Sequence, residues 1–183
     1  MSSTALLNAI EAGAKVQLQQ LLTQNPTIAL NVGHRLTSFV RLSPLLLAIS
    51  TDNADIVELL LSAKADPNFQ VGSFLPLAVA VARDNETVAA HLIRAGADVS
   101  HVDRTTAATA LHLAAARGNV GIARLLLERG AAIDLLDKNG DSALHLTVAG
   151  DKTDVAKLLL ANGASPFDRN DRLLLSTRSD SMA

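Results

Sequence analysis

The stretch TALHLAAARGNVGIARLLLERGAAID, residues 109–134, holds two short apolar segments separated by a glycine and an asparagine. Its first part, residues 110–117, is rich in Ala and Leu and contains no helix-breaking residue. Its second part, residues 122–129, repeats apolar residues at helical spacing. We therefore expect two short antiparallel helices joined by a tight turn at residues 118–119.

The same pattern recurs along the chain. Clear copies begin at Ser43, Leu75, Thr109 and Ser142, at steps of 32, 34 and 33 residues, and a weaker copy begins at Thr4. A fixed period of this length predicts a repeat protein. One helix pair is too thin to bury its own apolar stripe, so stacked pairs are expected to share a core.

The expected turns carry, in every copy, a residue with the same conformational preference. The break between the two helices falls at residues that enter the left-handed conformation readily; these are Gly13, Asp52, Asp84, Gly118 and Asp151. The second helix is expected to end at Gly96, Gly130 and Gly163, with positive φ. The second copy has Lys64 there, which predicts a strain of roughly 1 kcal/mol.

Composition excludes several classes of function. The net charge of the 183 residues is -2 without a block of like charges, and only four Phe and no Tyr or Trp are present, so nucleic acid and anionic lipid are not expected partners. No stretch predicts a membrane span or a secretory signal. The absence of Cys suits an intracellular protein, cytoplasmic first and nuclear as the alternative.

The copies resemble the ankyrin repeat, whose pattern is roughly Asp-x-x-Gly-x-Thr-Pro-Leu-His-x-Ala-Ala, then Gly-His, then Leu-Leu-Leu-x-x-Gly-Ala-Asp-x-Asn. The match is closest in the last two copies, at Thr109, Leu111, His112, Gly118, Gly130, Asp137, Gly140, Leu144, His145 and Gly163. The earlier copies depart from it, because the motif's His is replaced by Leu46 and Ala78 and the Asp-x-x-Gly hairpin is altered before the second, third and fourth copies.

The resemblance implies an all-α solenoid of about five helix-turn-helix repeats with short hairpin fingers. The ankyrin-repeat domain would span residues 1–175. Its repeats would cover approximately 4–36, 37–68, 69–100, 101–134 and 135–167, with a partial C-terminal cap at 168–175 and a flexible tail at 176–183.

The resemblance also implies that a monomeric chain binds a partner protein on a concave face made by fingers and first helices, as a scaffold, adaptor or inhibitor. The candidate partner-binding residues are Phe39, Arg41, Phe74, Arg83, Arg117 and Leu136. Their alternative interpretation is ordinary solvated surface, since scattered exposed apolar residues are normal.

No enzymatic chemistry is expected. His112 and His145 occupy equivalent positions, but no Cys or carboxylate cluster completes a metal site, and the resembled pattern gives this His structural hydrogen bonds at a helix start. No phosphate-binding loop or other cofactor motif occurs. Two alternatives stay open. The chain could be an auxiliary or regulatory subunit of an enzyme, although the 16 residues after Phe167 are too few for a catalytic domain. It could also be a self-associating structural stack.

Overall fold

The computed structural model describes residues 2–25, 28, 30–35 and 41–166. Within them the chain forms ten helices and one short hairpin. The helices are α1 Ser2–Glu11, α2 Lys15–Gln24, α3 Pro44–Ser50, α4 Ala54–Ser62, α5 Pro76–Ala82, α6 Glu86–Arg94, α7 Ala110–Arg117, α8 Val120–Glu128, α9 Ala143–Ala149 and α10 Thr153–Ala161. Strands β1 His34–Arg35 and β2 Arg41–Leu42 pair antiparallel. The expected all-α solenoid with five helix pairs is confirmed.

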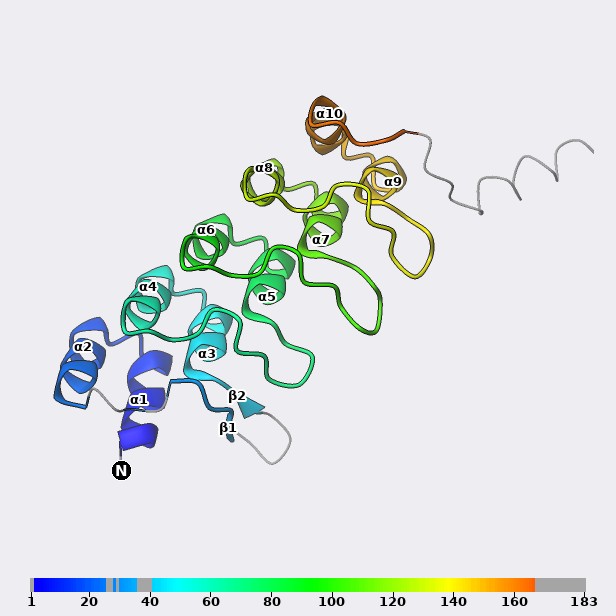
Figure 1. Ribbon diagram of the computed structural model, residues 1–183. Coiled ribbons are helices and arrows are strands. Elements are labelled where there is room, and N and C mark those ends of the chain that lie inside the picture. Colours follow the sequence, from blue (N-terminus) through cyan, green and yellow to red (C-terminus); the bar gives the residue numbers. More distant parts are fainter. Residues whose placement is uncertain (1, 26–27, 29, 36–40, 167–183) are drawn as a thin grey trace, which may run out of the picture. The chain divides into compact units, whose positions relative to one another are not determined.

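The chain divides into two compact units, Met1–Asp98 and Val99–Ala183, here called the N-terminal and C-terminal units. The N-terminal unit contains α1–α6 and the C-terminal unit contains α7–α10. In each unit the first helices of the pairs form one layer and the second helices form another, so that α1, α3 and α5 pack in sequence, as do α7 and α9 (Figure 1). The expected cap at 168–175 and tail at 176–183 lie outside the described residues.

The turn inside each helix pair has the expected left-handed residue. At this position φ is positive in every repeat, at Gly13, Asp52, Asp84, Gly118 and Asp151. One such residue reverses the chain and lets the next backbone N–H groups bond to the carbonyls that end the first helix. In the fourth repeat, for example, the N–H of Asn119 donates to the carbonyl of Ala114 at 3.1 Å.

The ends of the second helices α4, α6, α8 and α10 follow the same rule. Gly96, Gly130 and Gly163 have φ of 92°, 80° and 89°, and the N–H of the following alanine closes the turn, as between Ala131 and Leu126 at 3.0 Å. Lys64 takes the equivalent place with φ of 71°. A lysine is therefore held in the left-handed region that its Cβ disfavours, as the sequence predicts.

Side-chain caps mark where several of the helices begin. The Ser43 hydroxyl accepts the N–H of Leu46 at 3.2 Å and so caps the start of α3. Three second helices, α4, α6 and α8, start at an asparagine whose Oδ1 accepts the N–H three residues later. Lys152 stands at this position before α10 and makes no side-chain cap.

Small and branched apolar side chains fill the space between the helix layers. Leu60 and Leu92 are fully buried in the N-terminal unit, as are Leu111, Leu126 and Leu159 in the C-terminal unit. Fully buried alanines such as Ala114 and Ala123 let neighbouring helices approach closely. Among the described residues no helix is long and apolar enough to cross a membrane.

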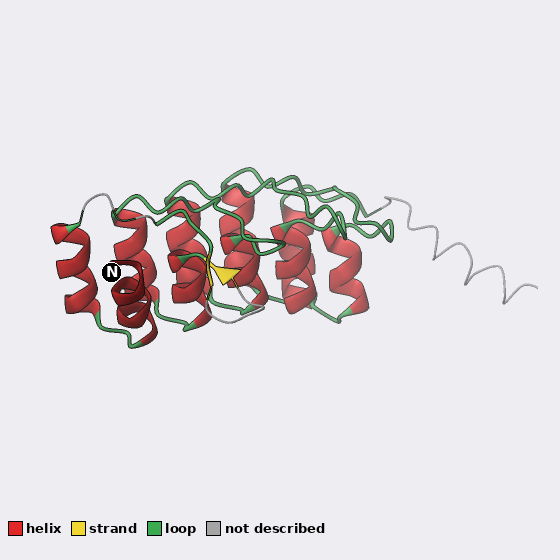
Figure 2. Ribbon diagram, turned by 90° about the horizontal axis from the view of Figure 1, so that it is seen from below, coloured by secondary structure: helices red, strands yellow, loops and turns green. Residues whose placement is uncertain are grey.

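Hydrogen bonds from one repeat to the next run along the loops that follow the second helices. Oδ1 of Asn31 accepts the N–H of Asp66, and Oδ1 of Asn68 accepts the N–H of Asp98, both at 2.8 Å. In the C-terminal unit the carboxylate of Asp134 accepts the N–H of Ser165 at 2.9 Å. These contacts hold successive loops side by side along one edge of each unit, where Figure 2 shows them as a green layer.

Candidate protein-interaction surface

Two loops of the C-terminal unit project from the first-helix layer as fingers, one at residues 102–108 before α7 and one at residues 135–141 before α9 (Figure 1). In the first, the N–H of Asp103 donates to the carbonyl of Ala108 at 2.9 Å, which closes the loop. In the second, the N–H of Asp137 donates to the carbonyl of Asp141 at the same distance. Each finger is therefore a tight turn that starts at an aspartate.

The two aspartates stabilise their turns through their carboxylates. Oδ1 of Asp103 accepts the N–H groups of Thr105 and Thr106 at 2.8 and 2.7 Å, and Oδ1 of Asp137 accepts the N–H of Asn139 at 2.7 Å. The hydrogen bonds from Thr106 and Thr105 lower the pKa of Asp103, because they favour the charged carboxylate. These negative charges are thus engaged inside the fingers.

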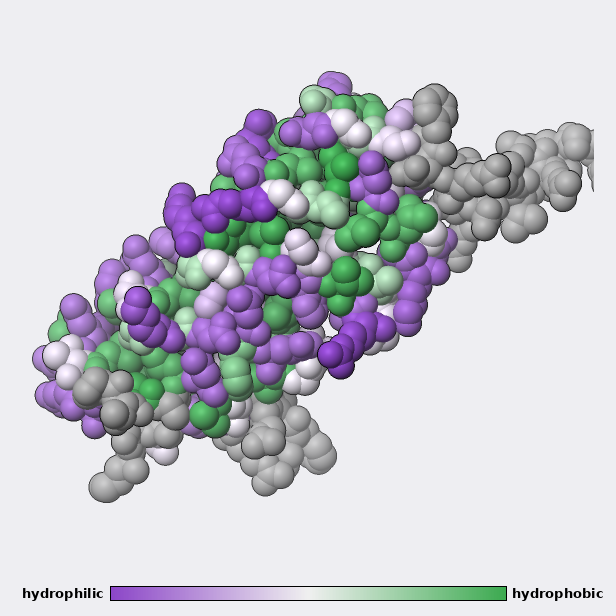
Figure 3. All heavy atoms as spheres, viewed as in Figure 1, coloured by the Kyte–Doolittle hydropathy of each residue, from purple (hydrophilic) through white to green (hydrophobic). Residues whose placement is uncertain are grey.

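The two fingers contact each other and expose apolar side chains. The N–H of Lys138 donates to the carbonyl of Thr106 at 2.8 Å, so the second finger lies against the first. Val102 and Leu136 are each 43% exposed, and Leu135 is 38% exposed. Figure 3 shows apolar atoms gathered over this part of the C-terminal unit. Three partly exposed apolar side chains thus lie on two fingers that contact each other, an arrangement that favours an interaction surface.

Cationic side chains lie on the same two fingers and at the far end of α7. Arg104 and Lys138 directly follow the turn aspartates and are exposed at the fingers. Arg117, the last residue of α7, is exposed at the far end of that helix, about 12 Å along its axis from the finger. None of these three forms an ion pair with any residue that the structure describes. They remain available to an acidic ligand.

The candidates of the N-terminal unit lie in different surroundings. Phe74 is 52% exposed and lies in a tight loop closed by two backbone hydrogen bonds with Val71. Arg83 follows α5 at its opposite end, and its Nε lies 3.6 Å from Oδ1 of Asp52. The pKa of Asp52 is lowered, first by a hydrogen bond from Asn85 at 2.8 Å and then by the charge of Arg83. Arg83 is therefore a partnered cation.

Two further candidates are only partly described. Arg41 belongs to β2, where its Cα pairs with that of Arg35, which places it in the finger before α3. Phe39 lies outside the described residues. Of the six predicted residues, the structure thus places Leu136 on a finger of the C-terminal unit and Arg117 at the end of α7 away from the fingers. Phe74, Arg83 and Arg41 lie in the N-terminal unit.

Sequence reasoning missed four residues of this surface, namely Val102, Arg104, Leu135 and Lys138. A signal was available for two of them, because Arg104 and Lys138 each follow a turn aspartate and lie 34 residues apart, one repeat length. Leu135 and Val102 gave no such signal, since an apolar residue in a loop can equally turn inward.

The paired histidines have the structural role that the resemblance implies. His112 is 1% exposed, and its Nδ1 accepts the N–H of Thr109 at 3.1 Å, so Nε2 carries the proton and donates to the carbonyl of Asp141 at 3.1 Å. His145 accepts the N–H of Ser142 in the same way at 3.1 Å. Within the described residues no three His, Cys, Asp or Glu side chains gather as a metal site would require.

Comparison with known proteins finds a matching family and a relative of similar sequence. The family model described as "Ankyrin repeats (3 copies)" matches residues 77–170, and the single "Ankyrin repeat" model matches residues 41–70. A segment of the potassium channel AKT3 of Oryza sativa subsp. japonica is 45% identical over 62 residues, which is 34% of this chain. The matched segment spans 7% of that channel.

Proposed function

This chain belongs to the ankyrin-repeat family, whose repeats generally mediate contacts between proteins, and from that premise we propose that it binds a partner protein through its fingers and first helices. It would act as a scaffold, adaptor or inhibitor, as a monomer and without catalysing a reaction. The cysteine-free composition favours a site of action inside the cell, in the cytoplasm or the nucleus.

The observation that carries this proposal is the exposure of Val102, Leu135 and Leu136 on two contacting fingers that also carry Arg104 and Lys138. Apolar anchors in the middle of an interface supply most of the binding energy, and a charged rim raises the association rate and selects the partner. The cations favour an acidic partner segment with apolar side chains. The closed turns of the fingers support tight binding, because rigid loops lose little entropy on association.

We extend the proposed surface to the remaining predicted residues. Arg117 would meet acidic groups of the partner beside the first helices, and Phe74, with Phe39 and Arg41, would add a second contact area on the N-terminal unit. Arg83 contributes less to binding in this proposal, because Asp52 already neutralises part of its charge. Removing Arg83 is expected to weaken the turn before α6 more than it weakens binding of the partner.

A random-peptide display library, selected on the immobilised protein, tests the proposal and requires no identified partner. We expect enriched peptides that combine Asp or Glu with large apolar residues. Binding of such a peptide should fall about tenfold or more in Leu136→Asp and in the double variant Arg104→Glu/Lys138→Glu, and it should weaken with added salt.

The matched control is the double variant Arg124→Glu/Lys157→Glu, which reverses two exposed charges on the second helices α8 and α10. It should bind the selected peptides like the parent protein. Loss of binding in this control with normal binding in the finger variant would place the surface on the second helices. Enriched peptides without acidic residues would contradict the proposed chemistry of the partner. An apparent molecular mass, measured by light scattering, that rises with protein concentration would favour the self-associating stack.

A further inference from the structure

Asparagine is followed directly by glycine at two places, at Asn139–Gly140 in the second finger and at Asn162–Gly163 at the end of α10. This pair is chemically labile, because the glycine backbone nitrogen can attack the side-chain carbonyl carbon of the asparagine without hindrance from a Cβ. A new N–Cγ bond forms, the Cγ–Nδ2 bond breaks, and ammonia leaves with the proton of the glycine N–H. Water then opens the resulting succinimide to aspartate or isoaspartate, so a neutral amide becomes a carboxylate.

Hydrogen bonds on both glycine nitrogens oppose this attack in the folded protein. The N–H of Gly140 donates to the carbonyl of Asp137 at 3.0 Å, and the N–H of Gly163 donates to the carbonyl of Leu160 at 3.1 Å. The reaction therefore needs a local opening that frees the glycine nitrogen and lets it approach Cγ. Its rate at each pair depends on how readily the surroundings of that pair open.

In the second finger, the bonds that hold the Asn–Gly pair converge on Asp137. Oδ1 of Asp137 accepts the N–H groups of Asn139 and Asp141 at 2.7 and 3.1 Å, and its Oδ2 accepts Nδ2 of Asn139 at 3.2 Å. Asn139 is exposed, and a Cβ built at Gly140 would meet no other atom within 4 Å. Little packing adds to these bonds, so Asp137 is the main restraint on the tip of the finger.

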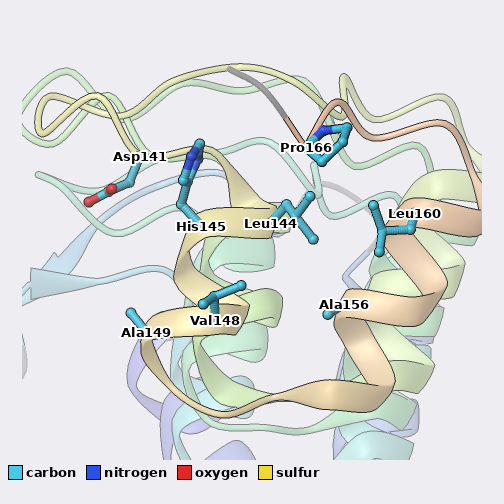
Figure 4. Close-up of a pocket in the computed structure, with 8 residues that line it drawn as sticks. All are labelled: Asp141, Leu144, His145, Val148, Ala149, Ala156, Leu160 and Pro166. Carbon is cyan, nitrogen blue, oxygen red and sulfur yellow. The ribbon is translucent and has the colours of Figure 1, made fainter. Parts of the chain in front are cut away.

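The base of this finger is held more firmly than its tip. The carbonyl of Asp141 accepts the Nε2–H of His112 at 3.1 Å and the N–H of Asp137 at 2.9 Å, and the chain then enters α9 through the buried Ser142. Figure 4 shows Asp141 where the loop enters α9, with its carboxylate pointing away from the apolar groove between α9 and α10. The tip can therefore open while the repeat stays folded.

The second pair is held by the helix that it ends. The N–H of Asn162 donates to the carbonyls of Leu158 and Leu159 at 3.2 and 3.0 Å, and its Nδ2 donates to that of Leu158 at 2.8 Å. The next residue after the pair, Ala164, is buried and donates to the carbonyl of Leu159 at 3.0 Å. Freeing the nitrogen of Gly163 requires the end of α10 to unwind, so this pair should react more slowly.

We propose that Asn139 is the deamidation site of this protein and that its conversion weakens binding of an acidic partner, a consequence that rests on the function proposed above. The product carboxylate replaces the amide that donates to Oδ2 of Asp137, so two negative charges face each other across the turn. Isoaspartate also routes the backbone through Cβ and lengthens the turn. The finger loses bonds that close it, and the added charge offsets that of the neighbouring Lys138 and repels acidic groups.

Peptide mapping by mass spectrometry, after incubation of the folded protein at mildly alkaline pH, tests the site. We expect Asn139 to deamidate about tenfold or more faster than Asn162. Asp137→Ala should accelerate the reaction at Asn139 further, because it removes the acceptor of three hydrogen bonds at the tip. The matched control is Asp134→Ala, which removes a carboxylate that accepts the N–H of Ser165 instead and should leave the rate at Asn139 unchanged.

The consequence is tested with Asn139→Asp, which carries the product charge, and with Asn162→Asp, which carries the same charge at the other pair. Amide hydrogen exchange of residues 137–141 should be faster in Asn139→Asp than in the parent protein. Peptides selected on the parent should bind Asn139→Asp about fivefold or more weakly, and they should bind Asn162→Asp like the parent.

The possible failures are distinguishable. Deamidation of Asn162 at an equal or higher rate, or a rate at Asn139 that Asp137→Ala leaves unchanged, would overturn the assignment of the site. Hydrogen exchange and peptide binding like those of the parent in Asn139→Asp would overturn the consequence. A library that yields no acidic peptide would contradict the proposed function and with it the effect on binding, while the mass-spectrometric result would still decide the site.

Discussion

Lys64 occupies a backbone position at which three other repeats have glycine. Its φ of 71° lies in the left-handed region, where a side chain costs about 1–2 kcal/mol. Lys64→Gly removes that cost, although the glycine also gains freedom in the unfolded chain. We expect a net stabilisation of about 0.5–1 kcal/mol, measured as a higher midpoint of urea denaturation.

Gly130 gives the reciprocal test at the same position of another repeat. Its φ is 80°, and a Cβ built there would meet no other atom within 4 Å, so strain alone opposes a side chain. Gly130→Val should destabilise the protein by about 1–2 kcal/mol or more, because a β-branched residue tolerates this conformation poorly. Gly121→Ala, inside α8, should be neutral or slightly stabilising. Equal midpoints for the two glycine variants would show that strain is not the determinant.

At the scale of the helix, α10 lacks the side-chain cap that α4, α6 and α8 have. Asn53, Asn85 and Asn119 each accept a backbone N–H with Oδ1, whereas Lys152 accepts none. Lys152→Asn is therefore expected to raise the free energy of unfolding by about 1 kcal/mol, and Asn53→Ala to lower it by a similar amount. Thermal denaturation of both variants measures the difference. A destabilised Lys152→Asn would show that packing of the lysine stem against Gly118 outweighs the cap.

The first finger of the C-terminal unit should respond to acid through Asp103. Backbone hydrogen bonds from Thr106 and Thr105 hold the pKa of this carboxyl below its ordinary value of 3.8. The stability it contributes is therefore present above pH 3.8 and is lost as the pH falls through the lower folded value. Asp103→Asn can keep the turn with its amide oxygen but cannot titrate, so its stability should change less between pH 5 and acid pH than that of the parent. Parallel curves of unfolding free energy against pH would contradict this assignment.

At the scale of the whole chain, the sequence predicts the repeats well because each boundary depends on local chemistry. Gly118 and Asp84 show positive φ where the sequence places the turns, and Ser43 and Ser142 cap the helices that it predicts. The pairing of Arg83 with Asp52 was not predictable, because it joins residues 31 positions apart whose approach depends on how two repeats stack.

The candidate surface was predictable only in part, for a related reason. The alignment of repeats locates Leu136 and Arg117, but it does not reveal which loop side chains turn outward. The exposure of Val102 and Leu135 follows from the closed turns of Asp103 and Asp137 and from the contact between the two fingers. These are tertiary features that the spacing of residues along one chain does not encode.

Stacked repeats also predict how a core defect spreads through the N-terminal unit. Leu18 in α2 and Leu60 in α4 are both fully buried, but α2 packs at the end of the unit against α1 and α4, whereas α4 packs between α2 and α6. Each substitution to alanine leaves a cavity and costs about 2–5 kcal/mol, and the middle position has neighbours on both sides that lose contacts. Leu60→Ala should therefore destabilise the unit more than Leu18→Ala does.

In amide hydrogen exchange, Leu18→Ala should lower protection mainly in α1 and α2, because the end repeat can open without its neighbours. Equal loss of protection across α1–α6 in Leu18→Ala would mean that the unit unfolds only as a whole.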